Sequence, residues 1–431
     1  MTITKTMNTG VSGLRSQQDA LGVVGDNIAN ANTVGFKQSR ALFEDVLADI
    51  STRQNRGIGE GARMVRAQQI FTQGALKNTA VPTDLALSGD GFFIVHGVSN
   101  GVSGDFFTRD GQFTLNKDGT LVNSHGLEVL GYPAQPTGGF VGPLSPVRVQ
   151  QFNLTPKPTA SVALAANLDS TSSAFLPGTF NPADPVSSSN FSTSITVYDN
   201  QVAAHTLDVY FMRQNDGNLV NPQPTNAWEI HVLDGSTDLT GGTPTTLQFG
   251  TDGTLVSQSA PIQLNVTYGN AGSQTINFDV GDPSAAGGTG LLGVSQFGAA
   301  SSMSSQTQDG YGAGNLTGID VTADGDVNGT FSNGQTLAIA KVAVAKFQAN
   351  GGLGRIGYNL WAKTQESGEP AIGSANTGGR GAVVSGAIEQ SNVDLATQFV
   401  DMIGFQRVFS ANAKTITTAD EMLLEAVNLK R

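Results

Sequence analysis

The chain contains no cysteine, and only 13% of its 431 residues are charged. The missing thiols exclude disulfide bonds, thiolate metal sites and cysteine-based catalysis. So little charge argues against long solvated helices as the main structure. The formal net charge of −12 argues against the basic face that nucleic-acid binding requires, so we expect no nucleic-acid partner.

Long apolar runs are also absent. No stretch of about eighteen apolar residues occurs, so we expect no insertion into a membrane. The first ten residues, MTITKTMNTG, lack the apolar core of a cleavable secretory signal. A cytoplasmic protein and an exported protein that keeps its N-terminus both fit this observation, and the residues alone leave the two open.

Apolar residues recur every seven positions near both ends of the chain. The repeats predict one helix from about Thr4 to Ala29 and another that begins near Asn392. This spacing is typical of a helix that buries a narrow seam against a second helix. The predicted assembly seam consists of Met7, Val11, Leu14, Leu21, Ile28, Leu395, Phe399, Met402, Phe409, Ile416 and Leu423.

The first helix contains Gly10, Gly13, Gly22 and Gly25, each of which costs about 1 kcal/mol relative to Ala. We therefore expect this helix to be disordered in the free monomer and to fold when its seam is covered. The apolar stripe of the second helix is wide, which favours burial on several sides in a crowded assembly. A helix pair packed on one globular core is the alternative.

Between the helices the sequence is typical of strands, Asp-Gly turns and glycine-rich loops. The strands that follow a proline-rich patch near residues 133–146 suggest a β-sandwich or barrel. Helical spacing returns only from Arg40 to Ile50. We predict a mainly β, nested multi-domain rod whose terminal helices pair as a coiled coil. Its parts are a helical domain (1–32 and 388–431), a linker region (33–72 and 378–387), an inner β domain (73–147 and 300–377) and an outer inserted β domain (148–299).

Two motifs that can bind ligands have simpler explanations here. Residues 324–329, DGDVNG, match half of an EF-hand loop, but Gln335 stands where the chelating Glu belongs. Residues 352–357, GLGRIG, match a dinucleotide fingerprint without the βαβ unit that it needs. We interpret both as turns or loops. The four histidines are scattered, so we expect no enzyme, no cofactor and no metal site.

Several segments resemble the axial proteins of the bacterial flagellum. Residues 26–37, DNIANANTVGFK, are similar to a segment shared by rod, hook and hook-associated proteins. SNVDL (391–395) and SANAK (410–414) resemble the C-terminal signature, although Phe409-Ser410 replaces the family's frequent aromatic-Gln pair. Residues 87–95 and 107–111 resemble motifs of the rod and hook branches. The resemblance marks Asn30, Asn32, Thr33, Gly35, Phe36, Asn392 and Asp394 as family motif and hinge residues.

The resemblance implies a subunit that leaves the cell through the flagellar type III export apparatus without signal cleavage. Its place would be the extracellular hook and basal body of the flagellum. The large β insert favours the hook branch, because distal rod proteins are much shorter. Hook subunits stack helically into a tubular universal joint that transmits torque from rod to filament. We also expect a bulky residue at Gly35 to affect assembly or bending more than monomer stability.

The implied partners are other copies of the chain, the distal rod protein, the hook cap protein and the hook-filament junction protein. Within the family, a rod or junction component is the alternative. In another class, the chain could be a secreted β-rich adhesin. That alternative needs dispensable terminal helices and an aromatic-lined groove in the insert, which contains Trp228.

Overall fold

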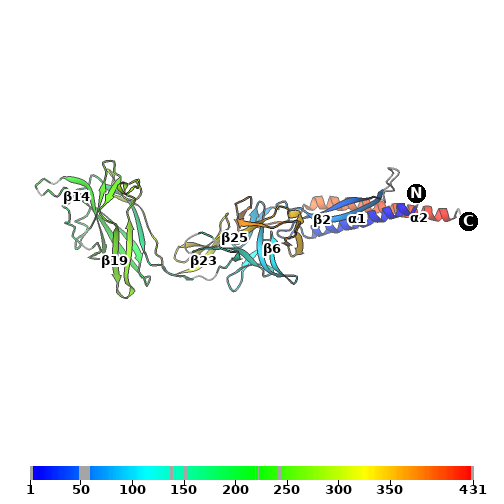
Figure 1. Cartoon of the computed structure of the whole chain (residues 1–431), viewed down its shortest axis with the longest axis horizontal. Helices are drawn as coiled ribbons and strands as arrows, with labels where there is room; N and C mark the ends of the chain where they lie inside the picture. The colour runs from blue at the N-terminus through cyan, green and yellow to red at the C-terminus, as the bar shows by residue number, and fades with distance from the viewer. Residues whose placement is uncertain are drawn as a thin grey trace. The chain divides into compact units, whose positions relative to one another are not determined.

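The structure is a computed structural model that describes residues 3–47, 59–135, 139–140, 142–149, 153–218, 220–221, 223–240 and 244–428. The chain forms two compact units. Unit 1 comprises Met1–Gln151, Thr317–Thr330 and Thr336–Arg431, and unit 2 comprises Phe152–Leu316 and Phe331–Gln335. Unit 2 is therefore inserted in the sequence of unit 1, to which both terminal helices belong (Figure 1).

The two predicted terminal helices are confirmed as α1 (Ile3–Ala29) and α2 (Leu395–Asn428), which lie side by side (Figure 1). Asp394 caps α2: its carboxylate accepts hydrogen bonds from Thr397 Oγ1 at 2.6 Å and from the Ala396 N–H at 3.1 Å. These hydrogen bonds lower the pKa of Asp394. Over the described residues, neither helix is both long and apolar enough to cross a membrane.

The predicted helix from Arg40 to Ile50 is wrong for the part that the structure describes. This segment forms β1 (Ser39–Leu47), which pairs antiparallel with β2 (Gly59–Gln69). Register shifts at Leu42/Phe43 and Asp45/Leu47 interrupt the strand, so its apolar residues do not alternate regularly and mimic helical spacing. Ile50 lies outside the described residues.

The β body of unit 1 is built around a sheet in the order β24-β25-β9-β5-β6-β27-β26. Two short ladders, β3 with β30 and β4 with β29, join the part of unit 1 that precedes unit 2 in the sequence to the part that follows it. The elements are β3 (Leu76–Asn78), β4 (Leu85–Ser88), β5 (Phe92–Ser99), β6 (Val102–Thr108), β7 (Phe113–Leu115), β8 (Leu121–Asn123), β9 (Glu128–Pro133), β10 (Ser145–Pro146), β23 (Gly314–Val321), β24 (Asp326–Phe331), β25 (Thr336–Lys346), the 3-10 helix η3 (Asn350–Gly352), β26 (Gly354–Gly357), β27 (Leu360–Ala362), β28 (Ala371–Ser374), β29 (Ala382–Ser385) and β30 (Ala387–Glu389).

Aromatic rings fill part of the core of this body. The Phe92 ring meets Phe71, Phe347 and Trp361 edge to face, with ring centroids 5.5 to 6.0 Å apart. Such pairs stabilise a core beyond the area that they bury. The same buried cluster includes Ile94 and Leu130 of the sheet.

Unit 2 is a β-sandwich, one of the two all-β folds suggested by the sequence. One sheet runs β19-β20-β12-β21 with β22 beside β12, and the other runs β13-β14-β15-β17-β18 with β16 beside β15. Both sheets contribute to one apolar core that contains Leu168, Phe211, Trp228 and Leu264. The elements are β11 (Asn153–Leu154), β12 (Ser161–Asp169), β13 (Phe191–Tyr198), β14 (Ala204–Asn215), β15 (Pro224–Asp234), β16 (Thr237–Asp238), β17 (Thr245–Phe249), β18 (Leu255–Gln258), β19 (Ile262–Tyr268), η1 (Gly269–Ala271), β20 (Gly272–Asp279), η2 (Ser284–Ala286), β21 (Ser295–Phe297) and β22 (Ser302–Gln308).

The boundary of the inserted unit differs from the expected end of the outer domain at residue 299. Unit 2 extends to Leu316, because β22 adds to the sandwich by pairing antiparallel with β12, from Val162 opposite Gln308 to Asn167 opposite Ser302. The finer division into four parts stays a prediction.

Both ligand-like motifs lie in turns or hairpins. Gly325 has φ of +85° and its N–H donates to the Thr322 carbonyl at 2.9 Å, closing the turn between β23 and β24. Asp326 pairs with Lys341 at 2.9 Å. The glycines of residues 352–357 lie in η3 and β26, which pairs antiparallel with β27. The predicted Asp-Gly turn is confirmed at Asp324-Gly325, whereas Gly354 and Gly357 lie in a strand of a hairpin and not in the expected loop.

Replacing Phe92 with Ala should lower the free energy of unfolding of unit 1 by about 3–5 kcal/mol, because it removes a buried ring from the aromatic cluster. Unit 2 should unfold as before. Each unit holds one of the chain's two tryptophans, Trp361 in unit 1 and Trp228 in unit 2. Denaturant titrations followed by fluorescence in Trp228→Phe and Trp361→Phe backgrounds therefore report the units separately. Equal shifts of both transitions would contradict the prediction.

Candidate functional site

The two terminal helices pack antiparallel, with small side chains at their closest approach. A Cβ atom on Gly10 would lie 2.9 Å from Cγ1 of Ile416, and one on Gly13 would lie 2.7 Å from Nδ2 of Asn412. Two of the glycines that weaken α1 therefore lie where α2 approaches closely, and a side chain there would have to displace Ile416 or Asn412.

A buried polar contact fixes the other end of the helix pair. The Asn27 side-chain amide donates to Gln398 Oε1 at 2.9 Å and to the Ser39 carbonyl at 2.7 Å, and its oxygen accepts from the Ser39 N–H at 2.8 Å. Ala20 and Val24 lie between these contacts and are buried. The face that α1 turns to α2 is thus made of small and polar residues, with one valine.

The predicted seam residues do not all meet within one chain. Ile416 contacts α1 beside Gly10. Half-buried positions are Met7, Leu14, Leu21, Ile28, Met402, Ile416 and Leu423, whereas Val11, Leu395, Phe399 and Phe409 are 36–46% exposed. The structure uses a neighbouring row of α1, because smaller side chains let the helix axes come closer than large apolar ones would. A role of the exposed residues in assembly stays a prediction.

The β1–β2 hairpin covers a further side of the helix pair. Phe43 of β1 meets Phe405 of α2 edge to face, with centroids 6.3 Å apart. At the other end, Ser12 of α1 donates to the Glu60 carbonyl of β2 at 3.4 Å, and Lys5 pairs with the Glu60 carboxylate at 3.7 Å. Part of the region expected to be a linker is therefore packed against the helices.

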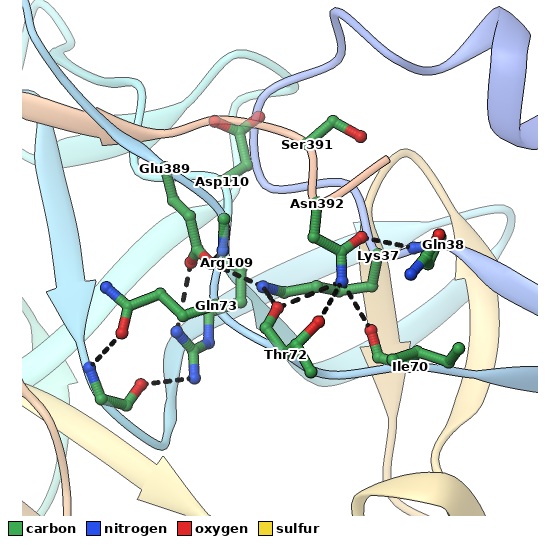
Figure 2. A network of polar contacts seen from close by, with 12 residues as sticks. Lys37, Gln38, Ile70, Thr72, Gln73, Arg109, Asp110, Glu389, Ser391 and Asn392 are labelled. Atoms are coloured by element: carbon green, nitrogen blue, oxygen red, sulfur yellow. Dashed lines mark hydrogen bonds and ion pairs between the residues drawn. The ribbon is translucent and has the colours of Figure 1, made fainter. Parts of the chain in front are cut away.

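The carboxylate of Glu389 forms the centre of the joint between helices and β body (Figure 2). Its oxygens lie 2.5 Å from Lys37 Nζ and 3.1 Å from Arg109 Nη1, and one also accepts from the Gly74 N–H at 2.8 Å. The Lys37 and Glu389 side chains are completely buried, and that of Arg109 is 4% exposed.

Burial and the partner charge act on Lys37 in opposite directions. Desolvation lowers the pKa of the Lys37 ammonium, while Glu389 raises it, and the pKa stays below its ordinary value. The ammonium also donates to the Thr72 carbonyl at 2.7 Å, and Arg109 donates to the Gly89 carbonyl at 2.8 Å. Removing one member of such a buried ionic group leaves the others without compensation.

Asn392 connects three segments on the same side of the joint (Figure 2). Its Nδ2 donates to the carbonyls of Ile70 and Thr72 at 2.9 and 3.1 Å, and its Oδ1 accepts from the Gln38 N–H at 2.8 Å. The segment after α1, the segment after β2 and the entry to α2 are therefore held by one side chain.

Gly35 is buried in the joint rather than free as a hinge. Its φ is +69° and its N–H donates to the Glu389 carbonyl at 2.7 Å. A Cβ atom here would lie 2.5 Å from the Asp110 nitrogen and 2.6 Å from the Arg109 carbonyl carbon. Glycine is thus required for its backbone conformation and for close packing, and a larger residue should disturb the monomer itself, contrary to the sequence-based expectation.

The remaining motif residues shape the turn that ends α1. Asn30 donates to the Asp26 carbonyl at 2.9 Å and accepts from Thr33 Oγ1 at 3.1 Å. Phe36 is 2% exposed and lies under the Arg355 guanidinium, whose carbon is 5.3 Å from the ring centroid. Asn32 is exposed. Apart from Asn32, the motif residues meet at or beside the joint.

Sequence reasoning missed the ionic centre of the joint. Lys37 and Arg109 stand within the quoted motifs, but neither was given a role, and Glu389, Asn27 and Gln398 were not singled out. One signal was present for Glu389, because a lone carboxylate follows two apolar residues in the strand Ala387–Glu389. A charged residue in such a place is rarely buried without a partner.

Family models match four stretches of the chain. They describe a flagella basal body rod protein (residues 7–37), the flagellar hook protein FlgE/F/G D1 domain (86–165), the flagellar basal body protein FlaE D2 domain (167–311) and the C-terminal part of the flagellar basal body rod FlgEFG protein (384–429). The first match includes Gly35 and Lys37, and the last includes Glu389 and Asn392.

Relatives that match over nearly the whole length of the chain show the family to which it belongs. The chain is 35% identical to the flagellar hook protein FlgE of Escherichia coli K12, over 97% of this chain and 98% of that protein. It belongs to the flagellar hook protein family. The hook protein of Borreliella burgdorferi is 33% identical over 99% of both chains.

A solved hook protein shares the fold. The crystal structure of the Helicobacter pylori flagellar hook protein FlgE2 matches with a TM-score of 0.53 at 14% identity, and covers 73% of this chain and 99% of that one. At this identity the likeness concerns architecture alone. Together with the two terminal helices, it shows the predicted fold class of a mainly β, multi-domain hook protein.

Replacing Glu389 with Gln should lower the free energy of unfolding of unit 1 by about 3–5 kcal/mol, because Lys37 and Arg109 stay buried without their counter-charge. The matched control is Glu369→Gln. Glu369 pairs with Lys363 at 2.9 Å, but the two side chains are 80% and 54% exposed, so its loss should cost less than about 1 kcal/mol. Urea titrations measure both, and similar effects would argue against a structural role of the buried centre.

Replacing Gly35 with Ala should destabilise unit 1 by more than the same change at Gly101. Both glycines have positive φ, +69° and +79°, so both substitutions carry a backbone cost of order 1–3 kcal/mol. Only Gly35 adds a clash with the Asp110 backbone, since a Cβ on Gly101 meets no described atom within 4 Å. Thermal unfolding compares the variants, and equal losses would show that packing at Gly35 does not matter.

Proposed function

We propose that the chain is the structural subunit of the bacterial flagellar hook and polymerises helically with copies of itself. The observation that carries the proposal is the uncovered apolar surface of α2. Exposed patches of this kind mark interaction sites in soluble proteins. Large apolar residues of α2 that are 38–68% exposed are Leu395, Phe399, Val400, Ile403, Val408, Phe409, Met422, Leu424 and Val427.

A homopolymer suits this surface better than a single helix pair does. The contact between α1 and α2 uses glycines, Ala20 and Asn27 on the α1 side, so most large apolar side chains of α2 stay outside it. Burying them between copies would supply the free energy of assembly, at roughly 25 cal/mol per Å² of apolar surface. The resulting tube acts as a flexible universal joint that transmits torque from rod to filament.

Further parts of the proposal rest on membership of the hook family. The subunit leaves the cell through the flagellar type III export apparatus without signal cleavage and works in the extracellular hook. Its partners at the ends of the tube are the distal rod protein, the hook cap protein and the hook-filament junction protein. It has no catalytic role.

The other functions that the sequence left open receive less support. An adhesin needs an aromatic-lined groove on unit 2, but Trp228 is completely buried in the sandwich core, and among the described residues of unit 2 Phe297, at 46%, is the one aromatic side chain classed as exposed. A rod or junction component fits the family models at both ends of the chain. The full-length relatives described above, however, are hook proteins.

Replacing Phe399 with Asp should abolish polymerisation and leave both units folded, because this side chain is 46% exposed and a carboxylate in an apolar interface is costly. Electron microscopy in high sulfate should show tubes for the unsubstituted chain and none for this variant. The control is Val186→Asp, at a 75% exposed position of unit 2, which should still form tubes.

Circular dichroism and tryptophan fluorescence check that the variants are folded. If the Phe399→Asp variant still formed tubes, the exposed surface of α2 around Phe399 would not be part of the assembly interface. If the unsubstituted chain formed no tubes, the proposal of a self-assembling hook subunit would fail.

A further inference from the structure

A groove runs along the side of α1 that faces away from α2. It has a volume of about 780 Å³ and lies between α1, β2 and the segment 351–355. Its lining includes Asp19, Gly22, Val23, Met64, Leu353 and Arg355. All of these residues belong to unit 1, so the groove is complete within one unit.

Gly22 has no structural reason inside the single chain. Gly10 and Gly13 lie where α2 approaches closely, but a Cβ on Gly22 would meet no described atom within 4 Å. A glycine inside a helix nevertheless costs about 1 kcal/mol relative to Ala. Gly22 lines the groove, so the absence of a side chain at this position leaves more space in the groove.

On α2, three exposed apolar residues form a row that ends in a cation. Leu395, Phe399 and Ile403 are 43–46% exposed and follow one another at four-residue spacing, which aligns them on one helix face. Arg407 is the next residue in the row. Its guanidinium is exposed and, within the described part of the chain, no ion pair includes it.

We propose that the groove of one copy receives Phe399 and Ile403 of this row from the α2 of a second copy. This inference rests on the proposed self-assembly and names its contact surfaces.

The groove is also lined by Arg66 and by the ion pair of Arg355 with Asp26. Local charge complementarity nevertheless supports a second copy as the occupant, because the carboxylate of Asp19 is exposed and forms no ion pair with any described residue. The two apolar side chains would fill the groove while Arg407 meets Asp19.

The register of α1 and α2 inside the chain predicts which residues would face each other in this contact. The contacts Gly10–Ile416, Gly13–Asn412 and Asn27–Gln398 pair residues whose numbers add to 425 or 426. A second α2 laid in the same register on the groove side of α1 places Ile403 opposite Gly22. It also places Arg407 opposite Gln18 and Asp19, so the large side chain meets the glycine and the cation meets the carboxylate.

The two surfaces differ, which determines the kind of assembly. A contact between unlike patches of identical subunits is heterologous and continues from copy to copy instead of closing as a two-fold dimer. Each subunit would offer its groove to one neighbour and its α2 row to another. Such a contact builds either a ring or an open helical polymer, and the proposed tube corresponds to the open form.

Cysteine cross-linking tests the contact directly, because the chain has no cysteine of its own. Tubes grown from equal amounts of Gln18→Cys and Arg407→Cys copies and then oxidised should contain disulfide-linked dimers. Tubes of either variant alone should contain none, and neither should a mixture of Thr6→Cys and Arg407→Cys, which lie more than three helical turns out of register. Thr6 is exposed on the same helix.

The outcomes separate this inference from the proposed function. Tubes without a disulfide between positions 18 and 407 would overturn the inference and leave self-assembly intact. Failure of the unsubstituted chain to form tubes would overturn both. A dimer that appears equally with Thr6→Cys would show random collision and would also count against the contact.

Gly22→Leu gives an independent readout in which helix propensity and assembly change in opposite directions. Leu favours the helix more than Gly does, so the helical signal of the free chain should not fall, whereas the filled groove should reduce the sedimented polymer at least about tenfold. The control Thr6→Leu places the same side chain on an exposed part of α1 outside the groove and should assemble normally. Normal assembly of Gly22→Leu would overturn the inference.

Discussion

The buried carboxylate of Glu389 is the constraint on which the architecture of unit 1 depends. It lies just before α2 and is neutralised by Lys37, just after α1, and by Arg109 of the β body. A carboxylate cannot stay ionised in such a place without these partners. The exit of α1 and the entry of α2 are therefore fixed at one point, and the antiparallel register of the two helices starts from it.

That register leaves the helix pair with two kinds of surface. Inside the chain, α1 meets α2 through Gly10, Gly13 and the Asn27 amide, contacts that position the helices but bury little apolar area. The large apolar side chains of α2 stay outside. Because burial of apolar surface is the main source of association free energy, the pair is positioned by polar and close contacts and is left to be stabilised by its neighbours.

The sequence predicted the parts of this arrangement that depend on local spacing. Both terminal helices and the Asp-Gly turns follow from periodicity and turn chemistry, and α2 begins beside its cap, Asp394. Periodicity could not tell which row of α1 faces α2, and strand irregularities between Leu42 and Leu47 imitated a helix. The ionic centre joins residues 37, 109 and 389, a contact that only the three-dimensional path of the chain reveals.

The two units differ in what they require for folding. Unit 2 closes its core among strands of one continuous stretch, with a short return of the chain at Phe331–Gln335. In unit 1, Lys37 and Glu389 are 352 residues apart in sequence, and contacts of such long range slow folding because the chain between them must first be brought together. The contacts that fix the end of α1 and the start of α2 need both the N-terminal and the C-terminal segment of the described chain. An incomplete subunit therefore lacks the fixed helix pair that presents the apolar surface of α2.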